Sequence, residues 1–366
     1  MKEKIFALLV FLLVSSTPVI ALAYDVNEKL TIEGTLTGVY QYGDLNITGM
    51  GNKDRGAVVF DLGVNFHSTK ADEFQITLSY AAGNGLNYLN LFSLAPYADD
   101  LEDDLKNING RNRDYLLEAW YKHTFTFTKD VSLGATFGII DSTGYIDDNA
   151  FANDEVAQFM NNIFVNSTLA NLPSYDIGGV AELNISNFSM RGLIMSTKDE
   201  EGKNYNYYAL QLGHKVETPF GEGNYRLYGY ITDDKFQNWG GTDNKSLRGF
   251  GISADQKLGK ILGVFARLGW QDDEAQVDHD TLYSGGLNIN GKLWGREKDE
   301  IGLGYAYLNG VDKAGIDDTN AFEAYARFKI SEFSDITFDV QYLNDNMRLV
   351  NDREGFIYGV RLNAYF

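Results

Sequence analysis

The sequence of 366 residues contains no cysteine, only four prolines, and far fewer basic than acidic side chains. Without cysteine, the chain can form no disulfide scaffold, thiol nucleophile or cysteine-based zinc site. Asp and Glu number 51 against 31 Lys and Arg, which gives a formal net charge of −20. Nucleic acid is therefore not an expected partner, because phosphate binding requires concentrated Lys and Arg.

Long apolar runs are also absent, except at the amino terminus. There, Lys2 and Lys4 precede an unbroken apolar run over residues 5–14, and a small-x-small cleavage site ends at Ala23. These features are typical of a secretory signal peptide, so we expect cleavage after Ala23 and a single mature domain over 24–366. An uncleaved anchor is disfavoured, because the run is shorter than the ~20 residues of a spanning helix. The mature chain is then either secreted and soluble or a β-barrel in an outer membrane.

Apolar and polar residues alternate with period two along most of the mature chain. For example, Phe338, Val340 and Tyr342 alternate with Asp339 and Gln341. This period predicts strands with two different faces, and segments of about ten residues can cross a bilayer as tilted strands. Sixteen such segments are predicted, at residues 29–42, 56–68, 72–83, 114–127, 131–141, 176–186, 187–197, 204–216, 224–233, 247–258, 261–272, 281–293, 300–309, 320–330, 334–344 and 356–366.

The connections between these segments alternate between short turns and longer loops. An even number of strands with both termini at the short-turn end is typical of bacterial outer-membrane barrels. We therefore predict an all-β fold, a 16-stranded antiparallel transmembrane β-barrel of the porin type with long extracellular loops. The strands of a soluble β-sandwich would also alternate apolar and polar residues, but such a fold would need neither sixteen strands nor so many aromatic residues near strand ends. Residues that suit two interfacial aromatic belts are Tyr40, Tyr115, Phe125, Phe127, Tyr342 and Phe366.

A barrel of this size encloses an aqueous channel, so function is expected from its inner face. Three kinds of side chain fall on the inward parity and are predicted to line the pore and bind solute. The arginines are Arg191, Arg226, Arg267, Arg327 and Arg361; the acids are Glu33, Asp61, Glu118, Glu323 and Asp339; the aromatics are Trp120, Tyr228, Tyr230 and Tyr325. Arginines that face acids would offer many hydrogen-bond donors, and aromatic faces stack on sugar rings. Alternatively, these charges pair with one another and only keep the channel hydrated.

Two connections are much longer than the others, at residues 84–113 and 142–175. In the second, Val156, Phe159, Met160, Ile163 and Phe164 recur at helical spacing. Asp154 and Glu155 suit the first turn of such a helix, where the helix dipole favours negative charge. This amphipathic helix would either fold into the lumen and narrow it or pack on the barrel rim. The acidic run at 99–104 in the first loop is predicted to be a solvated outer surface.

Several short stretches carry a family resemblance. They read GIID at 138–141, YIDDNAFAND at 145–154, QFMNN at 158–162, LRGFG at 247–251 and FARLGW at 265–270. The sequence here resembles the carbohydrate-selective porin family of Gram-negative bacteria and cyanobacteria. The resemblance implies a 16-stranded porin that passes sugars through a constriction with arginine and acidic side chains, although some relatives are general or ion-permeable channels. It also implies a constriction loop that begins at Asp141 and includes Asp147, Asp148, Asp154 and Phe159.

An enzyme at the loop rim is the rival class of function. His279 is predicted to lie in an extracellular loop between Asp278 and Asp280, where an Asp–His pair could act in proton transfer. A single histidine among acidic loop residues is more often solvated, so we expect no catalytic residue. No cofactor is expected, since the sequence contains no phosphate-binding glycine loop or nucleotide motif. The loop carboxylates suit Ca²⁺ chemically but lack the calcium-loop spacing, so no metal site is predicted.

Together these observations predict a passive outer-membrane porin for small hydrophilic solutes, with carbohydrates as the expected cargo. The first alternative is a general diffusion porin that prefers cations, and the second is the rim enzyme. The expected partners are sugars and ions in the channel, and membrane lipid and lipopolysaccharide around it. The sequence leaves a monomer and a homotrimer equally open.

Overall fold

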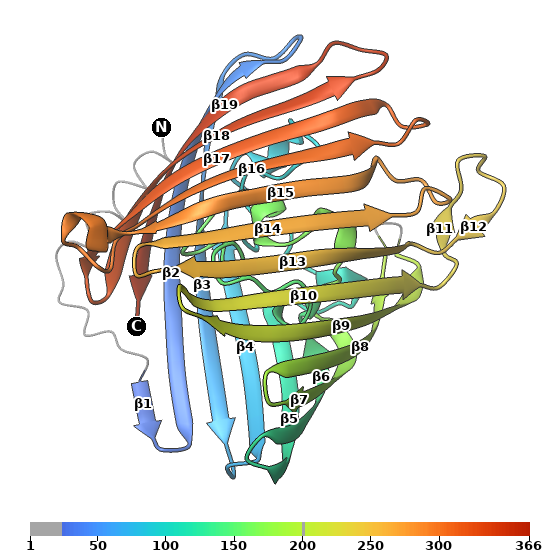
Figure 1. Ribbon diagram of the computed structural model, residues 1–366. Coiled ribbons are helices and arrows are strands. Elements are labelled where there is room, and N and C mark those ends of the chain that lie inside the picture. Colours follow the sequence, from blue (N-terminus) through green and yellow to red (C-terminus); the bar gives the residue numbers. More distant parts are fainter. Residues whose placement is uncertain (1–23, 200–201) are drawn as a thin grey trace.

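The computed structural model describes residues 24–199 and 202–366, so the predicted signal segment at 1–23 lies outside the described residues. Sixteen antiparallel strands form a closed barrel, in which β19 pairs with β2 (Figure 1). The barrel strands are β2 (Leu30–Asn46), β3 (Lys53–His67), β4 (Asp72–Ala82), β5 (Leu116–Thr128), β6 (Val131–Ile140), β7 (Asp176–Ile185), β8 (Phe188–Lys198), β9 (Asn204–Thr218), β10 (Gly221–Thr232), β13 (Arg248–Leu258), β14 (Leu262–Gln271), β15 (His279–Asn290), β16 (Glu300–Gly310), β17 (Ile316–Ser331), β18 (Ser334–Met347) and β19 (Arg353–Tyr365). Each of the sixteen predicted segments is one of these strands, which confirms the predicted fold class.

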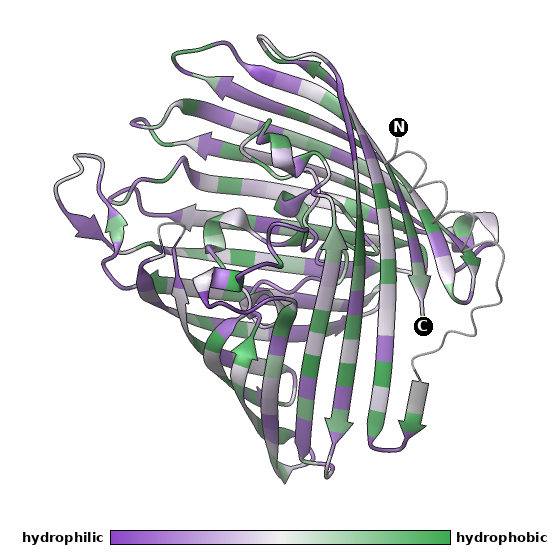
Figure 2. Ribbon diagram, turned by 180° about the vertical axis from the view of Figure 1, so that it is seen from behind, coloured by the Kyte–Doolittle hydropathy of each residue, from purple (hydrophilic) through white to green (hydrophobic). Residues whose placement is uncertain are grey.

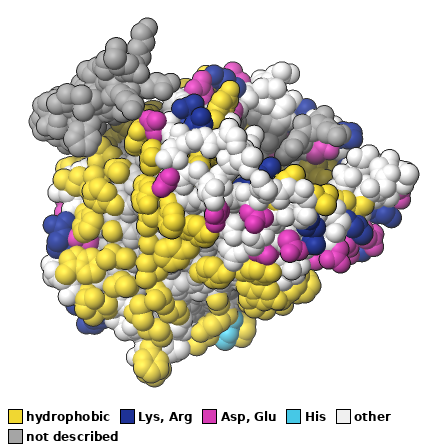
Figure 3. Space-filling view, turned by 90° about the horizontal axis from the view of Figure 1, so that it is seen from above, with side chains coloured by type: hydrophobic (Ala, Val, Ile, Leu, Met, Phe, Trp, Pro, Cys, Tyr) yellow, Lys and Arg dark blue, Asp and Glu magenta, His cyan; other side chains and the backbone are white. Residues whose placement is uncertain are grey.

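The two faces of each strand differ as the period-two pattern predicts. On β18, Phe338 is 51% exposed on the outer face, whereas Thr337 and Gln341 are buried on the inner face. Hydrophilic and hydrophobic residues alternate along the strands throughout the barrel (Figure 2). On the outside, hydrophobic side chains form a broad area, with charged side chains toward its edges (Figure 3). An apolar outer band around a polar interior is the arrangement that a barrel in lipid requires.

The ends of the barrel are unequal. Short turns at 68–71, 129–130, 186–187, 219–220 and 332–333 mark one end, which we call periplasmic. One connection at this end is longer than predicted, because β15 stops at Asn290 and a 3-10 helix, η5 (Gly291–Trp294), follows. Within the described residues, no helix is long and apolar enough to cross a membrane.

Two small strand pairings were not expected from the sequence. The four-residue strand β1 (Tyr24–Asn27) pairs with β2 at the periplasmic end. In the connection after β10, β11 (Phe236–Gln237) and β12 (Asn244–Lys245) form a short hairpin. β1 extends the barrel sheet along β2, whereas the β11–β12 hairpin is a separate two-stranded sheet.

The two long connections, 83–115 and 141–175, fold into the barrel, where their ribbons are visible in Figure 2. The first contains η1 (Asn87–Leu89) and η2 (Ile108–Gly110); the second contains η3 (Ser142–Gly144), α2 (Asn162–Val165) and η4 (Thr168–Ala170). Their apolar side chains pack against the inner wall, and Phe159 and Phe164 contact Phe265 of β14. The main hydrophobic core of this protein therefore lies inside the barrel, between loops and wall.

Three local predictions are wrong. The helix expected from Asp154 to Phe164 is limited to α2, and the Asp154 side chain instead accepts the backbone N–H groups of Val156 and Ala157 in a turn. The acidic run is not uniformly solvated, because Asp99 is only 6% exposed and accepts the Tyr97 hydroxyl. His279 is the first residue of β15 rather than a loop residue, and its Nε2 lies 3.0 Å from Thr319 Oγ1.

Candidate constriction site

The two inward loops hold each other. Ala98 N–H donates to the Met160 carbonyl at 2.8 Å. Ala95 and Asn162 bond reciprocally, through Asn162 N–H to the Ala95 carbonyl and Ala95 N–H to the Asn162 side chain, both at 3.2 Å. The Tyr175 hydroxyl donates to Asp100 at 2.6 Å. Because these bonds join residues far apart in sequence, the loops form one body inside the barrel.

Buried charged side chains of the wall fasten this body. Arg267 of β14 has no exposed surface, and its Nε lies 3.0 Å from Asp147 Oδ2. Its other nitrogens donate to the carbonyls of Phe164 at 2.8 Å and Val165 at 3.0 Å. Here a guanidinium supplies the donors for loop carbonyls that no helix or sheet satisfies.

A second set of wall groups holds the segment before α2. Glu323 of β17 accepts the backbone N–H groups of Met160 and Asn161. Arg361 of β19, also fully buried, donates to the carbonyls of Glu155 and Gln158. These contacts consume the backbone groups that a longer helix would have paired internally, which explains why the helical periodicity of 156–164 does not produce a helix.

Beside the loop body, charged groups of the wall form a ladder of alternating sign. Lys122 Nζ lies 2.6 Å from Glu182, Glu182 lies 3.6 Å from Arg191, and Arg191 lies 3.2 Å from Asp148 of the loop. Asp148 is also 2.8 Å from Arg226, which lies 2.7 Å from Asp255. We call these six residues the charge ladder; they come from β5, β7, β8, β10, β13 and loop 141–175. Several of them keep exposed surface, so the ladder presents both donors and acceptors to solvent.

Carboxyl groups of the loops form a second cluster, the acid cluster: Asp99, Asp100, Asp141 and Glu155. Enclosure by protein raises the pKa of Glu155 to about 8, and repulsion from Asp99 adds to the effect. Enclosure and the nearby Asp61 raise the pKa of Asp99 to about 7. The pKa values of Asp100 and Asp141 are also raised, chiefly by enclosure. Removing a carboxylate from bulk water disfavours its charged form.

The structure places most of the sequence-predicted site residues in three environments and the remaining three residues elsewhere. The charge ladder contains Arg191, Arg226 and Asp148; the buried contacts under the loops contain Arg267, Arg361, Glu323, Asp339, Tyr228, Tyr230, Tyr325, Asp147 and Phe159. Asp141 belongs to the acid cluster, and Asp61, Glu118 and Trp120 lie near it. Arg327 contacts Glu300 at the periplasmic end, Glu33 lies beside Gly63, and Asp154 is an exposed turn cap.

Sequence reasoning missed part of the ladder. Lys122 shares its strand face with Glu118 and Trp120, so the same parity that selected those residues also identifies it. Glu182 and Asp255 likewise lie on inward positions of their strands. The sequence also contains a feature that predicts the inward fold of loop 83–115. Leu86, Leu91 and Leu94 are too apolar for a solvated loop, and the structure buries all three. Among residues 24–199 and 202–366, no cluster of His, Asp and Glu has a metal-binding arrangement.

Comparison with known proteins decides the family. The family model described as carbohydrate-selective porin, OprB family, matches residues 57–366. The chain belongs to this carbohydrate-selective porin family. An uncharacterized protein of Aquifex aeolicus (strain VF5) is 35% identical over 296 residues, which cover 80% of this chain and 82% of that protein.

Solved structures agree on the fold of this porin. The high-pH structure of Pseudomonas putida OprB has a TM-score of 0.73 at 16% identity, with 93% of this chain and 95% of that chain covered. Pseudomonas aeruginosa OccK11 (OpdR) has a TM-score of 0.55 at 10% identity, with 95% and 99% covered. Family and fold together identify an outer-membrane channel protein for small solutes and not an enzyme.

Proposed function

We propose that this porin passes carbohydrates by diffusion along the partly exposed charge ladder. The observation that carries the proposal is the ladder itself, in which Arg191 and Arg226 both contact Asp148 of the inward loop. Sugar hydroxyls donate and accept hydrogen bonds, and a partly exposed row of alternating guanidinium and carboxylate groups offers both functions. Because neighbouring charges nearly cancel, a neutral solute meets many partners without a strong net field.

An aromatic side chain complements the ladder. Trp120 lies two residues from Lys122 on the same face of β5, is partly exposed, and donates its Nε1–H to Glu118 at 3.2 Å. A ring beside polar groups suits the apolar face of a pyranose, as in small-ligand sites that combine apolar surface with a few orienting polar groups. The family description supports the same class of solute.

The experiment is sugar block of ion current through the purified full chain in a planar bilayer. We expect stepwise conductance and a concentration-dependent block by maltose. Replacing both ladder arginines (Arg191→Gln, Arg226→Gln) should raise the half-blocking concentration about tenfold, the factor for one hydrogen bond to a charged group. Arg248→Gln is the matched control, since Arg248 is exposed and pairs with Asp272 outside the ladder. Conductance that no sugar blocks would leave a general porin.

The acid cluster favours a second candidate, a diffusion porin that prefers cations. Carboxyls with raised pKa values are neutral in acid and gain negative charge as the pH passes through those values. Because the pKa of Asp99 is about 7 and the pKa of Glu155 is about 8, the cation preference should grow from about pH 6 to about pH 9. The reversal potential in a salt gradient measures this preference. A strong, pH-dependent cation preference without sugar block would favour this candidate over the first.

A further inference from the structure

A groove at the periplasmic end of the lumen lies below the constriction and is not part of it. It consists of two cavities of about 550 and 460 Å³, which share Asn290, Glu297 and Glu300. Each volume is within the range of about 300–1,000 Å³ that is usual for small-ligand sites. Loop 141–175 contributes Ala157 to the first cavity and Ala150 and Phe151 to the second, so the groove lies where solute would leave the constriction.

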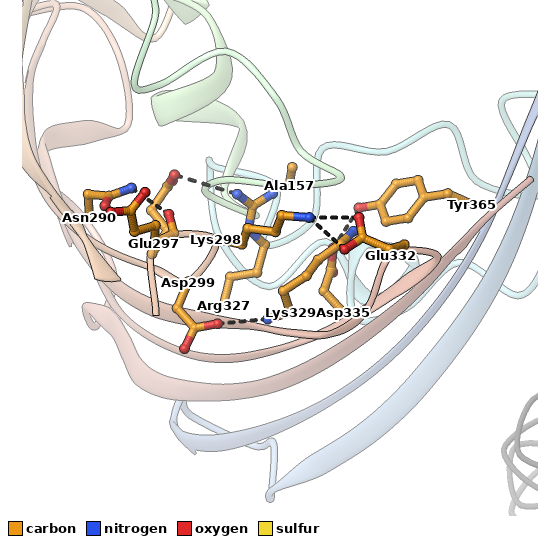
Figure 4. Close-up of a pocket in the computed structure, with 11 residues that line it drawn as sticks. Ala157, Asn290, Glu297, Lys298, Asp299, Arg327, Lys329, Glu332, Asp335 and Tyr365 are labelled. Carbon is orange, nitrogen blue, oxygen red and sulfur yellow. Dashed lines mark hydrogen bonds and ion pairs between the residues drawn. The ribbon is translucent and has the colours of Figure 1, made fainter. Parts of the chain in front are cut away.

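The first cavity is lined with paired charges, as Figure 4 shows. Lys298 Nζ lies 2.6 Å from Glu332, Lys329 lies 3.5 Å from Asp335, and Arg327 lies 3.5 Å from Glu300. The side chains of Arg327 and Glu300 are 21% and 17% exposed, so this end of the groove offers groups that can donate to or accept from hydroxyls.

The second cavity adds an aromatic ring. The side chain of Phe151 projects from loop 141–175, and its ring lies over Gly263 of β14. A Cβ atom at Gly263 would be only 2.3 Å from the Phe151 Cζ. The ring can occupy this place only because the wall residue has no side chain. Phe151 remains partly exposed and lines the cavity together with Asn288, Asn290 and Glu300. An apolar ring thus stands beside amide and carboxylate groups.

We propose that this groove is an exit subsite for one pyranose ring of a neutral sugar, which stacks on Phe151 and bonds through its hydroxyls to Glu300, Asn290 and Arg327. The proposal rests on the carbohydrate function proposed above and names a second place where the same solute is held. A pyranose has an apolar C–H face and a rim of hydroxyls, and it therefore matches a ring flanked by donors and acceptors. A subsite below the constriction would shorten the distance over which the solute is unbound.

The test compares Phe151→Leu with Phe151→Tyr in the full chain, using maltose as the probe in planar bilayers. We expect Phe151→Leu to raise the half-blocking concentration about tenfold, the factor for losing one well-packed ring contact. Phe151→Tyr keeps the flat ring, so maltose should block its current at the same concentration as in the original protein. Phe220→Leu, a change in an exposed turn at the same end, serves as the control. Conductance in sugar-free salt reports whether the constriction loop keeps its position.

The outcomes separate this proposal from the function on which it rests. If the original protein conducts but no sugar blocks it, the carbohydrate function fails. If maltose blocks the original protein and Phe151→Leu equally, only the exit subsite is overturned. The subsite is also overturned if Phe151→Tyr loses as much block as Phe151→Leu, because the flat ring is then not what binds. A change in sugar-free conductance with Phe151→Leu and unaltered maltose block would assign Phe151 to loop packing alone.

Discussion

At the scale of single residues, Arg267 shows how a charge inside a barrel can act on structure rather than on solute. It has no contact with water and holds Asp147, Phe164 and Val165 of the loop. Burying a guanidinium is costly unless every donor finds a partner and a counter-charge is close. Both conditions are met here, so removing either partner leaves the other buried without compensation.

We therefore predict that Arg267→Met lowers the free energy of unfolding by about 3–5 kcal/mol, the usual cost of breaking a buried pair. Loop 141–175 should also loosen, which increases current noise and single-channel conductance. Denaturant unfolding in detergent and bilayer recordings measure the two effects. The double variant Arg267→Met, Asp147→Asn should recover part of the loss, since it removes the unpaired charge and the side chain can still accept from Ser167 N–H.

Arg248→Met is the control for that experiment, because Arg248 is exposed and pairs with Asp272 and Glu274, which lie outside loop 141–175. Equal stability and conductance in Arg267→Met and the original protein would contradict the anchoring role. The inward arginines also show what the period-two alternation cannot predict. Alternation placed all five arginines on the inner face, but it cannot tell whether an inward side chain meets water, as Arg191 does, or a folded loop, as Arg267 and Arg361 do.

At the scale of elements, strands and loops differ in how far their sequences determine them. Each barrel strand has one face toward lipid and one toward the lumen, so apolar and polar residues alternate along its whole length. The strands could therefore be predicted from the sequence. In loop 141–175, four of the five apolar residues at helical spacing are buried (Phe159, Met160, Ile163 and Phe164), and Val156 is half-buried. The chain between them is held by Glu323 and Arg361 from distant strands. Periodicity reports burial and cannot report such partners, which is why the helix was predicted too long.

The fit between this loop and the wall depends on a glycine of β16. A Cβ atom at Gly304 would lie 2.8 Å from the ring of Phe164 and 3.0 Å from that of Phe159. We predict that Gly304→Ala displaces these rings and destabilises the protein by about 1–3 kcal/mol, as overpacking does. Gly192→Ala on β8, where a Cβ meets nothing within 4 Å, should change stability by less than about 0.5 kcal/mol.

Denaturant unfolding of both glycine variants and their single-channel conductance provide the measurement. If Gly304→Ala unfolds at the same denaturant concentration as Gly192→Ala and conducts identically, then the two rings do not pack rigidly against β16. A lower stability with changed conductance would show that the wall and loop 141–175 move as one unit.

At the scale of the whole molecule, the barrel depends on one seam, where β19 meets β2. The register runs from Glu354 opposite Asn46 to Tyr365 opposite Thr35. Phe366 extends the seam by one residue, since its backbone N–H donates to the Gly34 carbonyl and its own carbonyl accepts from Gly34. Its ring stacks on Phe60 of β3 with centroids 5.5 Å apart. Phe366 therefore contacts β2 through its backbone and β3 through its ring.

Closure is what leaves no strand edge unpaired in lipid, where each unsatisfied backbone group costs several kcal/mol. We predict that deleting Phe366 reduces the fraction of chains that reach the closed barrel, because two backbone bonds and a ring contact at the seam are lost together. Phe366→Ala keeps the backbone bonds and should fall between the deletion and the original protein. Heat-modifiable electrophoretic migration measures the folded fraction after refolding into detergent or lipid. Phe220→Ala removes an exposed aromatic ring from the same end without touching the seam and should fold normally; equal folded fractions for the deletion and this control would show that the seam closes without its terminal residue.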